Sequence, residues 1–235
     1  GTYGTFAFYT DVPEQYEGAS GGTVFPVRVE QQTLHARLVG PRNDFRREAP
    51  PSTLDFSVFV DASHPVVRID VDGQRVQIAE KQWSDWVRVS FALAQFVARV
   101  RGICRFYLKE VRPHFKLYVS PINIDPASPA LPISTPDSYS AELQDHLGMF
   151  YTQGIPQDTK ALASAVLDDG EFLQQARFVL EEELKMLQYH IQRFQEGLLF
   201  LYFGTVDQLS HTFWRSFDPQ HPAHEPGNRY AGVIE

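Results

Sequence analysis

Short stretches that alternate apolar and polar residues dominate the first half of the chain. A period of two is typical of β-strands with one buried face. Asp72-Gly73 lies between two such stretches and predicts a two-residue hairpin turn. Strands this short and this closely spaced favour a sandwich-like or curled antiparallel sheet. The predicted strands are Thr5–Thr10, Val24–Glu30, Thr33–Val39, Asp55–Asp61, His64–Val71, Gln74–Ala79, Trp86–Phe91, Ile103–Val111 and Phe115–Val119, with a loop over Pro41–Thr53.

The second half of the chain has a helical period instead. Apolar residues between Phe172 and Phe194 recur every three or four positions, which predicts a long helix over Asp169–Gln195 that stops before Gly197. The remaining expectations are a helix from Asp137 or Ser138 to Leu147, a helix from Asp158 or Thr159 to Val166, an extended connector over Pro121–Pro136 and a loop over Asp218–Tyr230.

A continuous apolar run, Leu198–Phe203, follows the long helix. Its length suits a strand buried on both faces, as in a parallel sheet covered by helices. Asp207 and His211 come next, four residues apart, so a helix that starts near Val206 places both side chains on one face. Ligands and metals gather outside the carboxyl ends of strands in open α/β sheets. The pair therefore indicates two metal ligands, a carboxylate and an imidazole.

Plainer interpretations exist for each candidate residue. Asp207 suits a helix N-cap and His211 an ordinary helix histidine, since this spacing is common by chance. Cys104 lies in an apolar strand pattern and is expected in the core. Other weaker candidates are given plain roles: Trp83 and Trp86 as packing residues, Asn123 and Asp125 as turn residues, His221 and His224 as surface-loop residues.

Composition limits the function classes. The chain has 235 residues and a single cysteine. Its net charge of −8 argues against nonspecific nucleic-acid binding. Residues 1–121 carry 15 Lys/Arg against 13 Asp/Glu, whereas residues 122–235 carry 6 against 16. This asymmetry predicts a boundary near Pro121 and three segments: a short core or linker segment over 1–22, a β-rich domain over 23–120 and a helix-rich part over 121–235. No stretch approaches the ~20 apolar residues of a membrane helix.

The segment Tyr202–Trp214 resembles a metal-ligand segment of the alkaline phosphatase superfamily. The similarity is to bacterial predicted phosphohydrolases and phosphomutases, which are related to type I phosphodiesterases and nucleotide pyrophosphatases. Several further stretches resemble the same branch in the expected order and together cover most of the chain: Gly1–Thr10, Trp83–Trp86, Arg105–Glu110, Leu117–Pro126 and Phe150–Lys160.

The resemblance implies a divalent-metal-dependent hydrolase acting on a phosphate monoester or diester. It implies an α/β/α core with two divalent metals, zinc first and manganese or magnesium as alternatives. Asp207 and His211 are the ligands carried over, and Thr205 and Gln208 are candidates to support them through hydrogen bonds. The phosphorylated Ser or Thr and the remaining ligands are expected outside this chain. The expected fold is therefore α+β or α/β, a β-rich insertion followed by part of an α/β/α core.

These expectations make the chain an internal segment of a longer enzyme, in which the rest of the parent polypeptide is a partner. The segment by itself is expected to be inactive, and its compartment, cytoplasm or periplasm, stays open. Two alternatives remain. The aromatic-rich β region is a noncatalytic module that binds sugar or a partner protein, or exposed core faces drive self-association.

Overall fold

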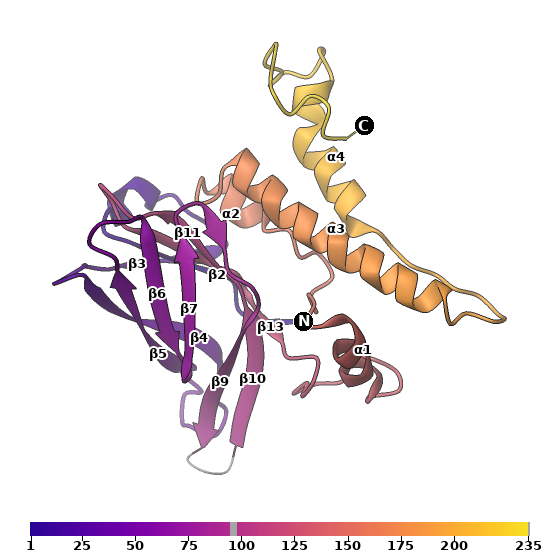
Figure 1. Ribbon diagram of the computed structural model, residues 1–235, viewed down its shortest axis with the longest axis horizontal. Helices are drawn as coiled ribbons and strands as arrows, with labels where there is room; N and C mark the ends of the chain where they lie inside the picture. Colours follow the sequence, from indigo (N-terminus) through magenta and orange to yellow (C-terminus); the bar gives the residue numbers. More distant parts are fainter. Residues whose placement is uncertain (95–97, 235) are drawn as a thin grey trace. The chain divides into compact units, whose positions relative to one another are not determined.

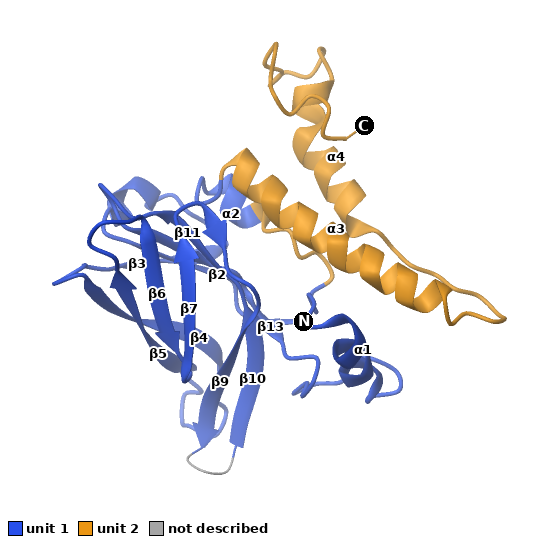
Figure 2. Cartoon of the chain, viewed as in Figure 1, with its two compact units in different colours: residues 1–153, 160–167 blue, residues 154–159, 168–235 orange. Residues whose placement is uncertain are grey.

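The protein has a mixed α+β fold that is rich in sheet. The computed structural model describes residues 1–94 and 98–234 (Figure 1). Two compact units divide the chain (Figure 2): unit 1 comprises residues 1–153 and 160–167, and unit 2 comprises residues 154–159 and 168–235. The predicted division into 1–22, 23–120 and 121–235 stays a prediction.

The described strands and helices follow in chain order. The strands are β1 (Thr2–Tyr3), β2 (Phe6–Thr10), β3 (Gly22–Pro26), β4 (Thr33–Arg42), β5 (Pro51–Val60), β6 (Val66–Val71), β7 (Gln74–Ala79), β8 (Gln82–Trp83), β9 (Val87–Ala94), β10 (Ala98–Cys104), β11 (Phe106–Glu110), β12 (Lys116–Val119) and β13 (Ile122–Ile124). The helices are the short 3₁₀ turn Pro13–Tyr16 and α1 (Tyr139–Leu147), α2 (Thr159–Ala163), α3 (Asp169–Ile191) and α4 (Gly204–Phe217).

Three sheets build unit 1. Their strand orders among the described residues are β1-β13-β10-β9, β3-β2-β12-β11-β8 and β4-β5-β6-β7. All pairs are antiparallel except β2 and β3, which run parallel. The outermost strands β3 and β4 are consecutive in the chain but belong to different sheets. The chain therefore passes from the edge of one sheet directly to the edge of the next.

One apolar core is shared by the three sheets. Phe56 and Ile69 from the β4–β7 sheet, Phe106 and Leu117 from the β3–β8 sheet, and Phe91 from the β1–β9 sheet are all buried in it. Alternate residues of β4, β5, β6 and β9 enter this core, as the period of two predicts. Closing apolar faces of sheets on one another is the layered packing expected of a sandwich. A second buried cluster on the other side of the β3–β8 sheet contains Phe8, Tyr107 and Tyr118 together with residues of and after α2.

The tryptophans and the cysteine have the packing roles expected of them. Trp83 packs against Tyr107, with ring centroids 4.8 Å apart, and Trp86 packs against Tyr151 at 4.5 Å. Cys104 is buried, and this burial raises the pKa of its thiol to about 12. A thiol with such a pKa is a poor nucleophile at neutral pH.

The helices of the second half begin close to the predicted residues, but α2 and α3 end earlier than predicted, at Ala163 rather than Val166 and at Ile191 rather than Gln195. Asp168 caps α3, where its side chain accepts a hydrogen bond from the Glu171 backbone and Glu171 accepts one in return. Gly148, with φ +82°, follows the end of α1. Helix α4 begins at Gly204, two residues before the predicted start near Val206.

The predicted strand Leu198–Phe203 is wrong for this structure. The segment has no regular secondary structure, and Leu198 and Phe200 are 91% and 81% exposed. A strand needs a neighbour that takes its backbone hydrogen bonds. The described residues of unit 2 contain no strand, so the run has nothing to pair with inside that unit.

The Asp72-Gly73 turn joins β6 to β7 as predicted. Both residues have positive φ, +47° and +74°, which is the geometry of a type I′ turn. A Cβ added at Gly73 would meet no atom within 4 Å, so only the backbone conformation opposes a larger residue there.

We expect Gly73→Ala to destabilise unit 1 by about 1 kcal/mol, because only glycine adopts this conformation without steric cost. Urea unfolding followed by the fluorescence of Trp83 and Trp86 measures the change. Gly18→Ala is the matched control, since Gly18 lies in open space and is not in the left-handed region. Equal stability of the two variants would contradict the turn geometry.

Candidate functional site

Helix α4 carries the predicted metal-ligand pair, and its buried face decides where that pair points. Thr205, Phe213 and Ser216 are buried. Asp207 and His211 lie on the opposite, outward face, where their side chains are 48% and 79% exposed. The first turn of α4 also contains Asp207, whose carboxylate suits the positive end of the helix dipole.

Asp207 and His211 are brought together as two ligands of one ion require. His211 Nε2 lies 3.4 Å from Asp207 Oδ1. Two ligands about 2.0–2.1 Å from a tetrahedral zinc lie roughly 3.3 Å apart. The helix therefore sets the two donor atoms at the edge length of a zinc coordination tetrahedron, with both side chains open to solvent. The same distance also suits the ion pair that a protonated His211 makes with Asp207.

The pair supplies only part of a ligand set. A catalytic zinc takes three protein ligands and a structural zinc takes four. Within residues 1–94 and 98–234, no group of three or more His, Cys, Asp or Glu side chains is placed to hold a metal ion. A metal ion held by Asp207 and His211 would therefore need further ligands from outside the described residues.

The two candidate supporting residues lie on different sides of α4. Gln208 Nε2 is 3.3 Å from Asp207 Oδ2, the carboxylate oxygen that does not face His211. Thr205 instead points inward, and its Oγ1 accepts a hydrogen bond from Gln157 Nε2 at 2.8 Å. Gln208 is thus placed to orient Asp207, whereas Thr205 contacts the interior of unit 2.

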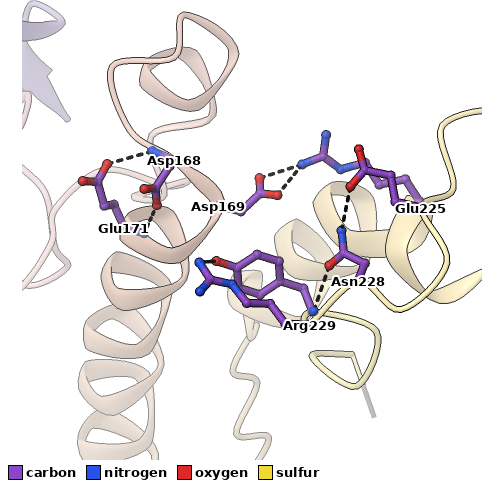
Figure 3. Close-up of polar contacts among 8 residues, drawn as sticks. Asp168, Asp169, Glu171, Glu225, Asn228 and Arg229 are labelled. Carbon is purple, nitrogen blue, oxygen red and sulfur yellow. Dashed lines mark hydrogen bonds and ion pairs between the residues drawn. The ribbon is translucent and has the colours of Figure 1, made fainter.

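Two further contacts hold α4 in place, and sequence reasoning did not single out their residues. The Gly204 backbone N–H donates to Glu183 Oε1 at 3.1 Å, which satisfies one of the open N–H groups at the helix start. Arg215 Nη2 contacts both carboxylate oxygens of Asp169, at 2.6 and 2.8 Å (Figure 3). These contacts join α4 to α3 at both ends and fix its rotation.

The tail after α4 folds back on the C-terminal half of that helix. The Tyr230 ring packs on Phe213, with centroids 5.4 Å apart. Arg229 Nη2 donates to the Tyr230 hydroxyl, and Asn228 lies beside Arg229 (Figure 3). His224 Nδ1 lies 3.1 Å from the Arg215 carbonyl, and His221 Nδ1 accepts the Ala223 backbone N–H. His221 thus stabilises a turn of the loop, and His224 holds the loop to α4.

Asp125 has the predicted turn role, whereas the turn role predicted for Asn123 is wrong, because Asn123 lies in strand β13 and holds a distant segment of backbone. Asn123 Oδ1 accepts the backbone N–H groups of Thr152 and Gln153 at 2.9 and 3.2 Å. Asp125 is buried, accepts the Ala127 N–H at 3.1 Å and pairs with Arg88 Nε at 2.7 Å. Their polar atoms are used within unit 1.

Comparisons of the chain with protein-family models, with curated proteins and with solved structures find no match. In the part of the chain that the structure describes, no helix combines the length and apolar character needed to span a bilayer.

We expect Thr205→Val to destabilise unit 2 by about 1–3 kcal/mol, because it removes the acceptor of a buried amide while keeping the side-chain shape. Unfolding followed by Trp214 fluorescence reports on this unit in a variant that lacks Trp83 and Trp86. Thr205→Ser keeps the hydroxyl and should lose less than about 1 kcal/mol. A Val variant as stable as the wild type would show that the hydroxyl is dispensable.

Proposed function

We propose that this chain is a segment of a divalent-metal-dependent phosphohydrolase that cleaves a phosphate monoester or diester. The observation that carries the proposal is the 3.4 Å separation of Asp207 Oδ1 and His211 Nε2 on the outward face of α4. The resemblance of Tyr202–Trp214 to a metal-ligand segment of the alkaline phosphatase superfamily supports the same assignment. The phosphorylated Ser or Thr lies outside this chain.

Each residue of the site has a defined task in this proposal. Asp207 would hold the metal through its carboxylate, while Gln208, 3.3 Å from Oδ2, would limit rotation of that carboxylate. His211, one helical turn further on, would supply the imidazole ligand. A bound divalent ion would neutralise phosphoryl oxygens and favour attack by a hydroxyl nucleophile. Zinc suits the carboxylate–imidazole donor pair, and manganese or magnesium are the alternatives.

The apolar run before α4 supports completion of the site by further polypeptide. Six apolar residues in succession, Leu198–Phe203, are typical of a strand buried on both faces. The run lies between α3 and α4, the order of a helix–strand–helix crossover. We propose that parallel strands from the rest of the parent polypeptide cover it, and that their carboxyl ends bring the missing ligands towards Asp207 and His211.

In the longer protein, Asp207→Ala should lose about one equivalent of bound metal, because one of the few ligands of that ion is removed. Its kcat/KM on chromogenic phosphate monoesters and diesters should fall by at least ~100-fold. Metal analysis and steady-state kinetics measure both effects. Ser210→Ala is the control on the same helix, since the Ser210 hydroxyl donates only to the Val206 carbonyl. Full metal content and turnover in Asp207→Ala would remove the basis of the proposal.

Phe200→Asp tests whether the apolar run is buried in the longer protein. There the variant should lose several kcal/mol of stability, since a charge enters a buried strand. In this chain alone it should change stability by less than about 0.5 kcal/mol, because Phe200 is 81% exposed. Urea unfolding of both proteins, with Phe200→Leu as the apolar control, gives the comparison. Equal small effects in both would show that no sheet covers the segment.

A further inference from the structure

Strand β4 is the outermost strand of its sheet, and its register shows which backbone groups are unpaired. Residues in β4 point their N–H and C=O groups alternately towards β5 and away from it. Thr33 exchanges both backbone hydrogen bonds with Glu30, on the side away from β5. The Arg37 carbonyl also points away, since it accepts the Tyr9 hydroxyl at 2.6 Å. Because the direction alternates along the strand, the backbone N–H and C=O groups of His35 and Val39 also point away from β5.

A cavity of about 830 Å³ lies along this edge of β4. Its lining includes His35, Arg37 and Val39 from β4, together with Phe25 and Val27 from the end of β3 and the residue that follows it. The hollow therefore separates the two outermost strands of neighbouring sheets. All of these residues belong to unit 1.

The cavity has an apolar interior and a polar outer side. Tyr9 and Phe56 are buried at its inner wall, with the Tyr9 ring stacked on Phe25 at 5.1 Å between centroids. On the outer side, Arg37 Nε pairs with Asp55 at 2.7 Å, and His35 Nδ1 contacts Ser57 Oγ at 2.9 Å. An occupant would meet apolar groups on one side and paired polar groups on the other.

We propose that this edge binds an extended peptide, which adds as a strand to β4. Backbone groups of alternate residues, His35, Arg37 and Val39, would pair with it, with the roughly 6.8 Å repeat of an extended chain. Alternate side chains of the peptide would enter the cavity towards Phe25 and Phe56. Their neighbours would lie beside the Arg37–Asp55 pair.

The unpaired backbone is what selects a peptide over other ligands. A sugar or a small apolar molecule can fill an apolar hollow, but neither repeats donors and acceptors at the spacing of a strand. The Tyr9 hydroxyl reaches the Arg37 carbonyl from the core side, and a carbonyl oxygen has two lone pairs. The second lone pair is open to an added strand. The ligand is thus a segment that alternates apolar and polar residues.

The test titrates the chain with an acetylated and amidated peptide of sequence Lys-Thr-Val-Thr-Val-Thr-Lys, followed by NMR shifts of the β4 amides. Two N-methylated isomers are the controls, one methylated at the threonines and one at the valines. In an antiparallel pair, residues whose side chains face outward like His35 bond to β4, so methylated threonines should weaken binding at least tenfold. In a parallel pair the valines bond to β4 instead, so the valine-methylated isomer should bind more weakly. Weaker binding of one isomer alone supports the proposal. Weaker binding of both isomers, or of neither, overturns it.

Protein variants give an independent readout of the same contact. His35→Pro removes an edge N–H without touching the β4–β5 hydrogen bonds, whereas His35→Ala removes only the side chain. We expect His35→Pro to bind the peptide at least tenfold more weakly than His35→Ala. Equal affinity of the two variants, or binding of the peptide with no shift at the β4 amides, would overturn the proposal. If His35→Pro fails to fold, the relative affinities of the two N-methylated isomers for the wild-type chain still test the proposal.

Discussion

The rotation of α4 is the constraint on which the candidate site depends. A helix places residues four apart on one face, but the sequence does not say which face turns inward. In the structure the face with Thr205, Phe213 and Ser216 is buried, and the Arg215–Asp169 ion pair holds α4 in this rotation. Asp207 and His211 point outward because the other face of α4 has partners. Any loss of those partners would change how the two side chains are presented without changing either residue.

Unit 1 and unit 2 leave different kinds of groups without partners. In unit 1 the apolar faces of the sheets pack in two buried clusters, and backbone donors and acceptors are open along β4. In unit 2 the open groups are apolar side chains, Leu198 and Phe200 above all. Unpaired backbone favours an added strand, whereas exposed apolar side chains favour burial under a sheet. Both proposals follow from this difference, but each can fail without the other.

Local patterns were reliable where a short stretch carries its own physical signal. Asp72-Gly73 forms the predicted turn because both residues tolerate positive φ. By contrast, Gln31 and Gln32 adopt positive φ in a tight turn, although neither is a glycine, asparagine or aspartate from which such a turn could be predicted. The loop predicted over Pro41–Thr53 is shorter than expected, since β4 extends to Arg42 and β5 begins at Pro51. Strand ends depend on the neighbouring strand, which a local pattern does not contain.

By itself, the sequence determined the two periodicities, the start of α3 at Asp169, the end of α1 at Leu147, and the one-turn spacing of Asp207 and His211. These follow from chain geometry within a few residues. Only the tertiary structure decided that Thr205 turns inward, that Leu198–Phe203 forms no strand here, and that the free edge of β4 faces a cavity. Each of these depends on groups far apart in the chain, because pairing and burial require a partner.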